Sequence, residues 1–374
     1  MFVHRQRLTH LLRPEHYADP SQHEAEQERL FRPSWQFIAT TSQLASPGDF
    51  ITIELFGTPV LVRNFDGRFV AFVNICPHRH TMLTCQADGH AKELKCQYHG
   101  WQFKEDGRAS KIPEPKAFRP WDRENAQLVT VRLSRCGDLL FASLDPNGPS
   151  LQSWLAPYFD MIEERFGSPN WSRAFNWDFD AACNWKVVIE NTLESYHVAE
   201  VHPDWMGGQL PAEENATHEL TDRYTMLRYS DDGVLQARAL RVCRLLGGDP
   251  IDGYWHLHFH PNLVFVCNDT LNFVVSTRPT GPQTCHVMMR VFPLWPRTRR
   301  PERLAIRWAN WWAAGRLTKK IFNEDRSIYE AQQLGISRSP HRGVIGIREE
   351  RIFQFQRYVC QQTGLDLQAA ANSE

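Results

Sequence analysis

The segment Cys76–Trp101, CPHRHTMLTCQADGHAKELKCQYHGW, constrains this chain more than any other. It contains three thiols and four imidazoles, which are side chains that bind transition metals. Cys76 and His78 form one pair, and Cys96 and His99 form a second pair after a gap of 17 residues. Each pair fits on one short loop, so the sequence predicts a metal centre held between two loops.

One thiolate and one imidazole from each loop form the ligand set of a Rieske [2Fe–2S] cluster, in which two histidines replace two cysteines on one iron. On this interpretation Cys76 and Cys96 bind the iron that the protein buries, and His78 and His99 bind the outer iron. The imidazole edges then face solvent or a partner, which suits a centre that passes electrons onward.

Structural zinc is the alternative, because two cysteines and two histidines also form a tetrahedral zinc site. Zinc fingers usually carry both cysteines before both histidines, whereas here each loop supplies one of each. Cys85, His90 and His80 lie in the same segment, and we interpret them as loop side chains rather than ligands. Iron and sulfide in equal amounts would distinguish the cluster from zinc.

The length and charge of the chain limit the classes of protein to which it can belong. Its 374 residues exceed one ordinary hydrophobic core, which predicts two domains. Lys+Arg number 42 and Asp+Glu 43, so no net field favours nucleic acid or an anionic membrane. The sequence shows no apolar run near the roughly 18 residues of a membrane span, and its start lacks the apolar core of a signal peptide. Nine scattered cysteines fit reduced thiols, so a cytoplasmic location is expected.

Strand and helix signals divide the chain into three parts. Residues 1–42 form a predicted helical segment that packs on the larger domain, and its helix begins at the capping Asp19. Residues 43–149 alternate apolar residues with turns, which predicts a small all-β domain that carries the cysteine–histidine pairs. Residues 150–374 combine helical stretches, at 150–166, 183–203 and 302–335, with a run of strands. The predicted class is therefore α+β, with an antiparallel sheet flanked by helices in the larger domain.

A second group of candidate ligands lies in NWKVVIENTLESYHVAEVH, residues 184–202. On one continuous helix Glu190, Glu194 and His197 share a face, and His202 lies about 140° away from His197. Both imidazoles reach one metal only if the helix ends or distorts between them, and the proline that follows favours an end there. Two histidines and a carboxylate form the facial triad of a non-haem Fe(II) oxygenase, which leaves positions open for O2 and substrate.

Two carboxylates are candidates for the third ligand. Glu194 is local, three residues before His197. Asp325 lies on the apolar face of a predicted helix in KKIFNEDRSIYEAQQLG and should point inward, whereas Glu324 shares a face with Lys320 and should be more exposed. An inward carboxylate is costly unless it is paired or bound to a metal, so a buried salt bridge is the alternative for Asp325. For the two histidines the alternative is an ordinary core or surface position.

These motifs resemble those of the terminal-oxygenase α subunits of Rieske non-haem iron oxygenases, over nearly the whole chain. The matching segments are EQERLFRPSWQFIA, PGDFITIELFGTPVLVRNFDGRFVAFVNICPHR, CQYHGWQF, NWKVVIENTLESYH with a following histidine, and NEDRSIYEAQQLG. The resemblance implies cluster ligands Cys76, His78, Cys96 and His99, and ligands of a mononuclear Fe(II) at His197, His202 and Asp325.

The resemblance also implies further roles and partners. Glu194 occupies the position of the family's bridging acid, which links a cluster histidine of one subunit to an iron-ligating histidine of its neighbour and implies a homotrimer. Asn191 matches an asparagine near the iron, with a supporting role. Electrons come from NAD(P)H through a separate flavin and iron–sulfur reductase, with or without a ferredoxin, and O2 and a small organic molecule are the substrates.

Two positions depart from the family pattern. The family usually has Cys-x-His-Arg-Gly, and here Arg79 is followed by His80. Members that act on aromatic rings mostly carry aspartate at the bridging position, whereas Glu194 resembles members that oxidise quaternary ammonium compounds. We therefore expect a monooxygenase or demethylase of a quaternary ammonium or small aromatic compound. The alternatives are an aromatic-ring cis-dihydroxylating dioxygenase and, from another class, a Rieske electron carrier without oxygenase activity.

Five residues of the larger domain are candidates for the substrate pocket. An aromatic cage can bind a cationic nitrogen, and the aromatic members of this set suit such a cage. The alternative is that they fill the core. The candidates are Trp205, Trp255, His256, Phe259 and Asn262.

Overall fold

The computed structural model divides into two compact units. The smaller unit is Phe31–Glu163, and the larger unit combines Met1–Leu30 with Glu164–Glu374. The domain boundaries expected after residues 42 and 149 stay predictions. The residues that the structure describes are 1–120, 126–171, 174–206, 213, 216–229, 234–251, 253–296, 298 and 300–366.

The smaller unit is built on a seven-stranded antiparallel sheet. Its strands are β2 Gln36–Thr40, β3 Asp49–Leu55, β4 Thr58–Phe65, β5 Arg68–Val73, β6 Asp88–His90, β10 Thr130–Cys136 and β11 Leu139–Ser143. The strand order is β2-β11-β10-β5-β4-β3-β6. The loops Phe56–Gly57 and Asp66–Gly67 join β3 to β4 and β4 to β5, and both residues of each loop have positive φ. Two-residue loops of this kind match the twist of the paired strands, so the register of the hairpins is set locally.

A second, three-stranded sheet in this unit consists of β7 Leu94–Lys95, β8 Gln102–Phe103 and β9 Ala109–Lys111. The loop after β5 and the loop between β7 and β8 contain the two cysteine–histidine pairs. Cys76 and Cys96 belong to one cluster of buried apolar residues, together with Phe72 and Trp101. The two loops are therefore anchored in a common core.

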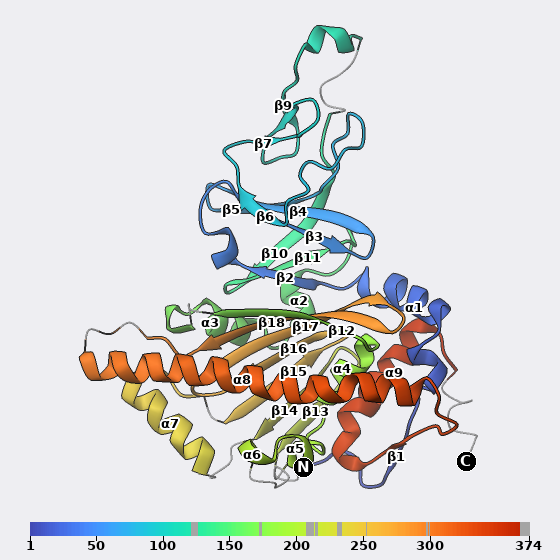
Figure 1. Cartoon of the computed structure of the whole chain (residues 1–374), viewed down its shortest axis with the longest axis vertical. Coiled ribbons are helices and arrows are strands. Elements are labelled where there is room, and N and C mark those ends of the chain that lie inside the picture. The colour runs from blue at the N-terminus through green and yellow to red at the C-terminus, as the bar shows by residue number, and fades with distance from the viewer. Residues whose placement is uncertain are drawn as a thin grey trace. The chain divides into compact units, whose positions relative to one another are not determined.

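The larger unit contains a second seven-stranded antiparallel sheet (Figure 1). Its strands are β12 Phe175–Ala181, β13 Thr217–Leu220, β14 Tyr224–Tyr229, β15 Tyr254–Phe259, β16 Leu263–Cys267, β17 Leu271–Gly281 and β18 Thr284–Pro293. The strand order is β12-β18-β17-β16-β15-β14-β13. Strands β15 to β18 are consecutive hairpins with largely buried residues, as expected for a sheet covered by other elements.

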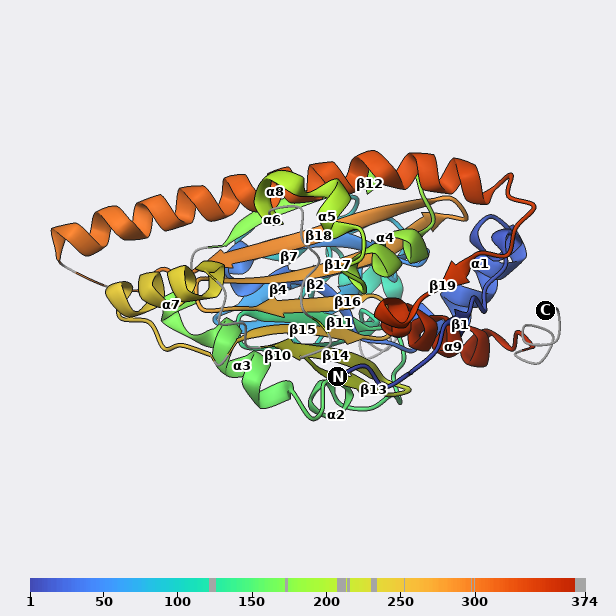
Figure 2. The ribbon, with the colours of Figure 1, turned by 90° about the horizontal axis from the view of Figure 1, so that it is seen from below.

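Helices pack against this sheet (Figure 2). Those of the larger unit include α1 Pro20–Glu26, α4 Trp185–Thr192, α5 Val198–Val201, α6 Pro203–Met206, α7 Val234–Leu246, α8 Pro301–Ile336 and α9 Glu350–Thr363. Helix α4 contacts β17 and β18, whereas the long α8 contacts β12, β18 and α4. The two units together confirm the predicted α+β class, with an antiparallel sheet flanked by helices in the larger unit. Among the described residues, no helix combines the length and apolarity needed to cross a membrane.

One predicted helix is wrong. The stretch 150–166 forms two helices, α2 Leu151–Trp154 and α3 Phe159–Gly167, instead of one. Pro157 lies between them, and a proline inside a helix removes a hydrogen bond and clashes with the preceding turn.

A buried ion pair joins α4 to α1. The Lys186 ammonium donates to Glu26 Oε1 at 2.6 Å, and the Trp185 indole N–H donates to Glu26 Oε2 at 2.7 Å. The side chains of Lys186 and Glu26 are both 0% exposed. Because α4 also carries the candidate site residue Asn191, this pair stabilises a helix on which the site depends.

Glu26→Gln is expected to lower the free energy of unfolding by about 3–5 kcal/mol, because it leaves the Lys186 ammonium buried without a counter-charge. Urea denaturation measures the change. The double variant Glu26→Gln with Lys186→Met should recover much of the loss, since it also removes the charge that is costly to bury. Glu24→Gln, at an exposed position of the same helix, is the matched control. An unchanged stability in the Glu26→Gln variant would contradict the prediction.

Candidate functional site: two sets of metal ligands

Two loops of the smaller unit, Cys76–Thr81 and Cys96–Trp101, have the same backbone hydrogen bonds. In each loop the cysteine N–H donates to the carbonyl five residues later, at 2.8 Å in both cases. The N–H four residues after the cysteine, from His80 or Gly100, donates to the cysteine carbonyl at 3.0 Å or 3.1 Å. Cys-x-His and Cys-x-x-His are thus presented by equivalent turns.

His80 occupies the position where the resemblance leads us to expect glycine. Its φ is +58°, and that of Gly100 at the equivalent place in the second loop is +72°. A left-handed conformation costs a residue with a β-carbon roughly 1–2 kcal/mol. Histidine is among the residues that tolerate it best, so the loop keeps its shape despite the departure from the family pattern.

The thiols of the two loops are buried and the imidazoles are partly exposed. Cys76 and Cys96 are 1% and 2% exposed. The ring centroids of His78 and His99 are 4.7 Å apart, and His78 stacks on Trp101 at 4.7 Å with an angle of 4° between the planes. The structure therefore brings together all four residues that the sequence singled out.

The chemistry of these four residues fits a Rieske cluster. Burial raises the pKa of the Cys76 thiol to about 11, and the neighbouring Cys96 thiol adds to the effect. Thiols in this environment ionise when a metal binds them. His99 Nδ1 is buried and has no hydrogen-bond partner among the described residues, so its nitrogen is available to a metal.

The second ligand set lies beyond the end of α4. The helix predicted over 183–203, with an end or distortion between His197 and His202, is wrong in where it breaks, because α4 ends at Thr192, whose hydroxyl donates back to the Ile189 carbonyl at 2.7 Å. Glu194 Oε2 then accepts hydrogen bonds from the backbone N–H groups of Tyr196 and His197, the latter at 3.1 Å, and so closes the turn that precedes α5.

The broken helix separates residues that a continuous one would have aligned. Glu190 lies on α4 and accepts a hydrogen bond from the Tyr17 hydroxyl at 2.7 Å, away from the candidate ligands. His197 immediately precedes α5, and His202 immediately follows it. The interruption therefore falls before His197 rather than between the two histidines.

Asp325 of α8 completes the second set. One ligand atom each of His197, His202 and Asp325 lie within 4.8 Å of one another. Asp325 Oδ1 is 3.0 Å from His202 Nε2 and 3.5 Å from His197 Nε2. This buried oxygen has no hydrogen-bond partner in the part of the chain that the structure describes. Two imidazole nitrogens and an unpartnered carboxylate oxygen at one point fit a divalent metal with two histidines and one carboxylate.

Each of the two imidazoles has a carboxylate on its other nitrogen. His197 Nδ1 lies 2.5 Å from Glu194 Oε1, and His202 Nδ1 lies 2.9 Å from Glu324 Oε2. A carboxylate can only accept here, so both Nδ1 atoms carry a proton, and both Nε2 atoms face Asp325, the candidate carboxylate ligand. Metal-ligating histidines usually have such a partner, which fixes the tautomer and the orientation of the ring.

The electrostatic environment of His202 is strongly acidic. Burial lowers its pKa, but the nearby carboxylates of Asp325 and Glu324 outweigh burial and raise the pKa above its ordinary value. The carboxylates thus favour a positive charge at this position. Either a protonated imidazole or a divalent cation bound between the ligands provides that charge.

Asn191 and the third-ligand helix are connected. Tyr329, four residues after Asp325 on α8, donates its hydroxyl to Asn191 Oδ1 at 3.2 Å. Asn191 therefore links α4 to the helix that carries Asp325, which is compatible with a supporting role.

The structure gives other surroundings to most of the candidate pocket residues. His256 lies against the buried Arg351, whose Nη2 is 2.8 Å from His256 Nδ1. Phe259 is 1% exposed within the sheet, and the Asn262 amide donates to Thr277 O at 2.5 Å. The Arg228 guanidinium lies 4.5 Å from the Trp255 ring centroid. The side chain of Trp205 lies outside the described part of the structure.

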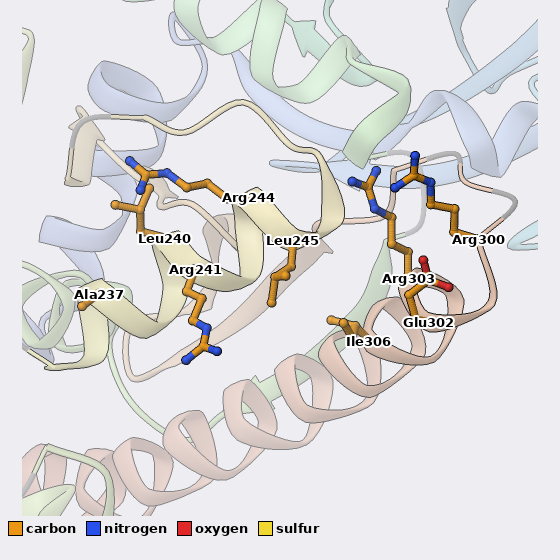
Figure 3. A pocket seen from close by; sticks show the side chains of 9 residues that line it. All are labelled: Ala237, Leu240, Arg241, Arg244, Leu245, Arg300, Glu302, Arg303 and Ile306. Carbon is orange, nitrogen blue, oxygen red and sulfur yellow. The ribbon is translucent and has the colours of Figure 1, made fainter.

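Three hollows in the described part of the chain border α8, one of them between it and strands β12 and β18. A cavity of about 610 Å³ lies between α7 and the start of α8, where Leu245 and Ile306 face the space between the helices (Figure 3). A groove of about 880 Å³ runs along α8 and includes Lys320 and Glu324 in its wall. The cavity contains none of the residues that the sequence singled out, whereas the groove reaches the carboxylate that contacts His202.

The sequence analysis missed one functional contact, the one between Glu324 and His202. Glu324 is more exposed than Asp325, as expected, with side-chain exposures of 25% and 7%. The signal available in the sequence was the pair of adjacent acids, Glu324 and Asp325, together with two candidate histidines. Helices α7 and α9 were also not predicted.

Comparisons with known proteins match the two parts of the chain that contain these residues. A family model described as Rieske [2Fe-2S] domain matches residues 34–130, and one described as ring hydroxylating alpha subunit (catalytic domain) matches residues 168–364. The carnitine monooxygenase oxygenase subunit of Acinetobacter baumannii is 26% identical over 363 residues, which cover 92% of this chain and 92% of that protein.

Two solved structures share the fold. The quaternary ammonium Rieske monooxygenase CntA in complex with L-carnitine has a TM-score of 0.72 at 22% identity, over 96% of this chain and 95% of that one. Naphthalene 1,2-dioxygenase from Rhodococcus sp., bound to indole, has a TM-score of 0.71 at 16% identity, over 97% and 95%. The same fold therefore occurs in a monooxygenase and in a dioxygenase.

The two family models match a Rieske domain and a ring-hydroxylating catalytic domain in one chain. A catalytic domain of this kind excludes the alternative of an electron carrier alone, and a Rieske domain excludes structural zinc at the cysteine–histidine pairs. The chain belongs to the ring-hydroxylating α subunits of the Rieske oxygenases, oxidoreductases that combine a [2Fe–2S] cluster with a mononuclear non-haem iron.

Proposed function

We propose that this chain is the oxygenase subunit of a monooxygenase that hydroxylates or demethylates a small quaternary ammonium compound. The observation that carries the proposal is the similarity over 92% of the chain to a carnitine monooxygenase oxygenase subunit. Glu194 beside His197 supports it, because glutamate at this position resembles members of the family that oxidise quaternary ammonium compounds.

We assign the ligands as the two sets described above. Cys76, Cys96, His78 and His99 hold the cluster, and His197, His202 and Asp325 hold the mononuclear iron. An Fe(II) bound there supplies the open positions at which O2 and substrate react. The chain itself holds the imidazoles in one tautomer, through Glu194 and Glu324, and places Asp325 between their Nε2 atoms.

The assembly and the partners belong to the same proposal. The chain forms a homotrimer in the cytoplasm and receives electrons from NAD(P)H through a separate flavin and iron–sulfur reductase. Glu194 bridges His197 to a cluster histidine of the neighbouring subunit. Its oxygens contact His197 and two backbone N–H groups, which fixes the orientation of the carboxylate. Its side chain is 10% exposed, so a small part of it remains accessible to a neighbouring subunit.

The test is substrate-dependent O2 uptake with a surrogate reductase. A panel of trimethylammonium carboxylates, such as carnitine and glycine betaine, is compared with aromatic acids and with naphthalene. We expect O2 uptake and loss of an alkyl group, or a hydroxylated product, with a trimethylammonium compound. Calorimetry with the uncharged carbon isostere of the best substrate is the matched control, and the loss of the positive charge should weaken binding roughly 10-fold. O2 uptake with aromatic compounds alone would overturn the proposal.

A second candidate is an aromatic-ring dioxygenase. The match to the catalytic domain of ring-hydroxylating α subunits and the fold shared with naphthalene 1,2-dioxygenase favour this candidate. A cis-dihydrodiol among the products of the aromatic members of the panel would establish this second activity.

A further inference from the structure

One imidazole of the catalytic unit is held between two neighbouring acids of α8. Glu324 Oε2 lies 2.9 Å from His202 Nδ1, and Asp325 Oδ1 lies 3.0 Å from His202 Nε2. Side chains of adjacent residues on a helix point about 100° apart. Glu324 and Asp325 can therefore reach the two nitrogens of the His202 ring only if an edge of that ring faces α8. His202 is 3% exposed, which leaves its ring little freedom to rotate.

Glu324 is itself held in place. Lys320, one turn earlier on α8, lies 3.5 Å from Glu324 Oε1 and donates to Asp204 Oδ2 at 2.8 Å. Asp204 lies on α6, two residues after His202. The Lys320 ammonium therefore joins α6 to α8 beside the imidazole, and it leaves the other oxygen of Glu324 directed at His202.

The two acids have different tasks. Asp325 Oδ1 has no hydrogen-bond partner among the described residues and faces both Nε2 atoms, as a metal ligand does. Glu324 contacts the opposite nitrogen, from which it cannot reach the same metal. A carboxylate that accepts the Nδ1 proton keeps the Nε2 lone pair available and makes the imidazole a stronger donor.

We propose that Glu324 is a positioning residue that fixes the tautomer and orientation of His202 for iron, with Lys320 and Asp204 holding Glu324 in turn. This inference rests on the proposed iron site. It adds to that site a chain of contacts running from His202 through Glu324 and Lys320 to Asp204. Lys320 and Glu324 line the groove along α8, so this series of contacts extends from the buried imidazole to the protein surface.

The test is the affinity of the mononuclear site for Fe(II) in protein that keeps its cluster but has lost the mononuclear iron. Fe(II) is titrated back, and the nitrosyl complex that it forms with added nitric oxide is measured by electron paramagnetic resonance. The amplitude reports occupancy and the line shape reports the symmetry of the ligands. We expect Glu324→Ala to weaken Fe(II) binding by about 10–100-fold and to change the line shape.

Three variants separate positioning from a general effect on folding. Glu324→Gln keeps an oxygen that accepts the Nδ1 proton, so it should retain the wild-type line shape and lose less affinity than Glu324→Ala. Lys320→Met should weaken binding by less than Glu324→Ala, because it removes only the support of Glu324. Glu330→Gln, an exposed glutamate on the same helix, should match wild type. The absorption of the cluster and the thermal unfolding midpoint confirm that each variant is folded.

Wild-type affinity and line shape in Glu324→Ala would overturn the positioning role and leave the iron site intact. Wild-type protein that binds no Fe(II) beyond its cluster would instead overturn the proposed iron site, and the positioning role with it.

Discussion

Asp325→Ala is expected to abolish substrate-dependent O2 uptake and product formation while the visible spectrum of the [2Fe–2S] cluster stays unchanged. Asp325 supplies the only carboxylate that faces the Nε2 atoms of both His197 and His202 among the described residues. Loss of an outer partner of a ligand costs about 10–100-fold, and loss of the ligand itself should exceed that range. The cluster ligands belong to the other compact unit, so the cluster should remain.

Iron content and spectra distinguish this loss from unfolding. Asp325→Ala should contain the iron and sulfide of its cluster but lack the additional iron of the wild type. Asp325→Asn is the control that preserves size, because its amide oxygen is a weaker, uncharged ligand, and it should fall between alanine and wild type. Full activity in Asp325→Ala would show that another residue completes the site, and Glu194 would then be the next candidate.

The two cluster loops could be predicted from the sequence because their ligands are local. Each cysteine and its histidine lie within four residues, and the turn that presents them is closed by hydrogen bonds inside the same loop. The hairpins around them also carry their turn signals in the sequence, at Gly57 and Asp66–Gly67. Local chemistry of this kind does not depend on how distant parts of the chain pack.

The catalytic site could be predicted only in part, because its geometry depends on contacts between distant segments. The candidate ligands are recognisable by residue type, but the sequence led us to expect the break in the helix between His197 and His202. The helix instead ends at Thr192, and Glu194 accepts from the backbone N–H groups of Tyr196 and His197. A side chain that bonds to nearby backbone groups competes with the helix, and periodicity does not show which of them prevails. The contact between Glu324 and His202 spans 122 positions in sequence, so only the folded chain shows it.

Glu194→Gln is expected to reduce turnover by about 10–100-fold while both metal centres stay occupied. The two carboxylate oxygens have separate tasks, since Oε1 faces His197 Nδ1 and Oε2 accepts from the N–H groups of Tyr196 and His197. Glutamine has only one accepting oxygen, so its NH2 group must face a donor on one side. Either the imidazole loses its partner or the two backbone N–H groups before α5 lose their acceptor, and the charge that stabilises the imidazole N–H is lost in both cases.

The measurements that test this variant are turnover, iron content and the rate at which the reduced cluster is reoxidised in the presence of substrate and O2. If Glu194 links His197 to a cluster histidine of the neighbouring subunit, reoxidation should slow in parallel with turnover. If Glu194 serves only His197 and the turn before α5 within its own chain, the substrate affinity and thermal stability should change more than reoxidation. Glu200→Gln, at an exposed position of α5, is the matched control for a lost charge nearby. Wild-type turnover in Glu194→Gln would contradict both roles, because the charge of the carboxylate is lost whichever way the amide group faces.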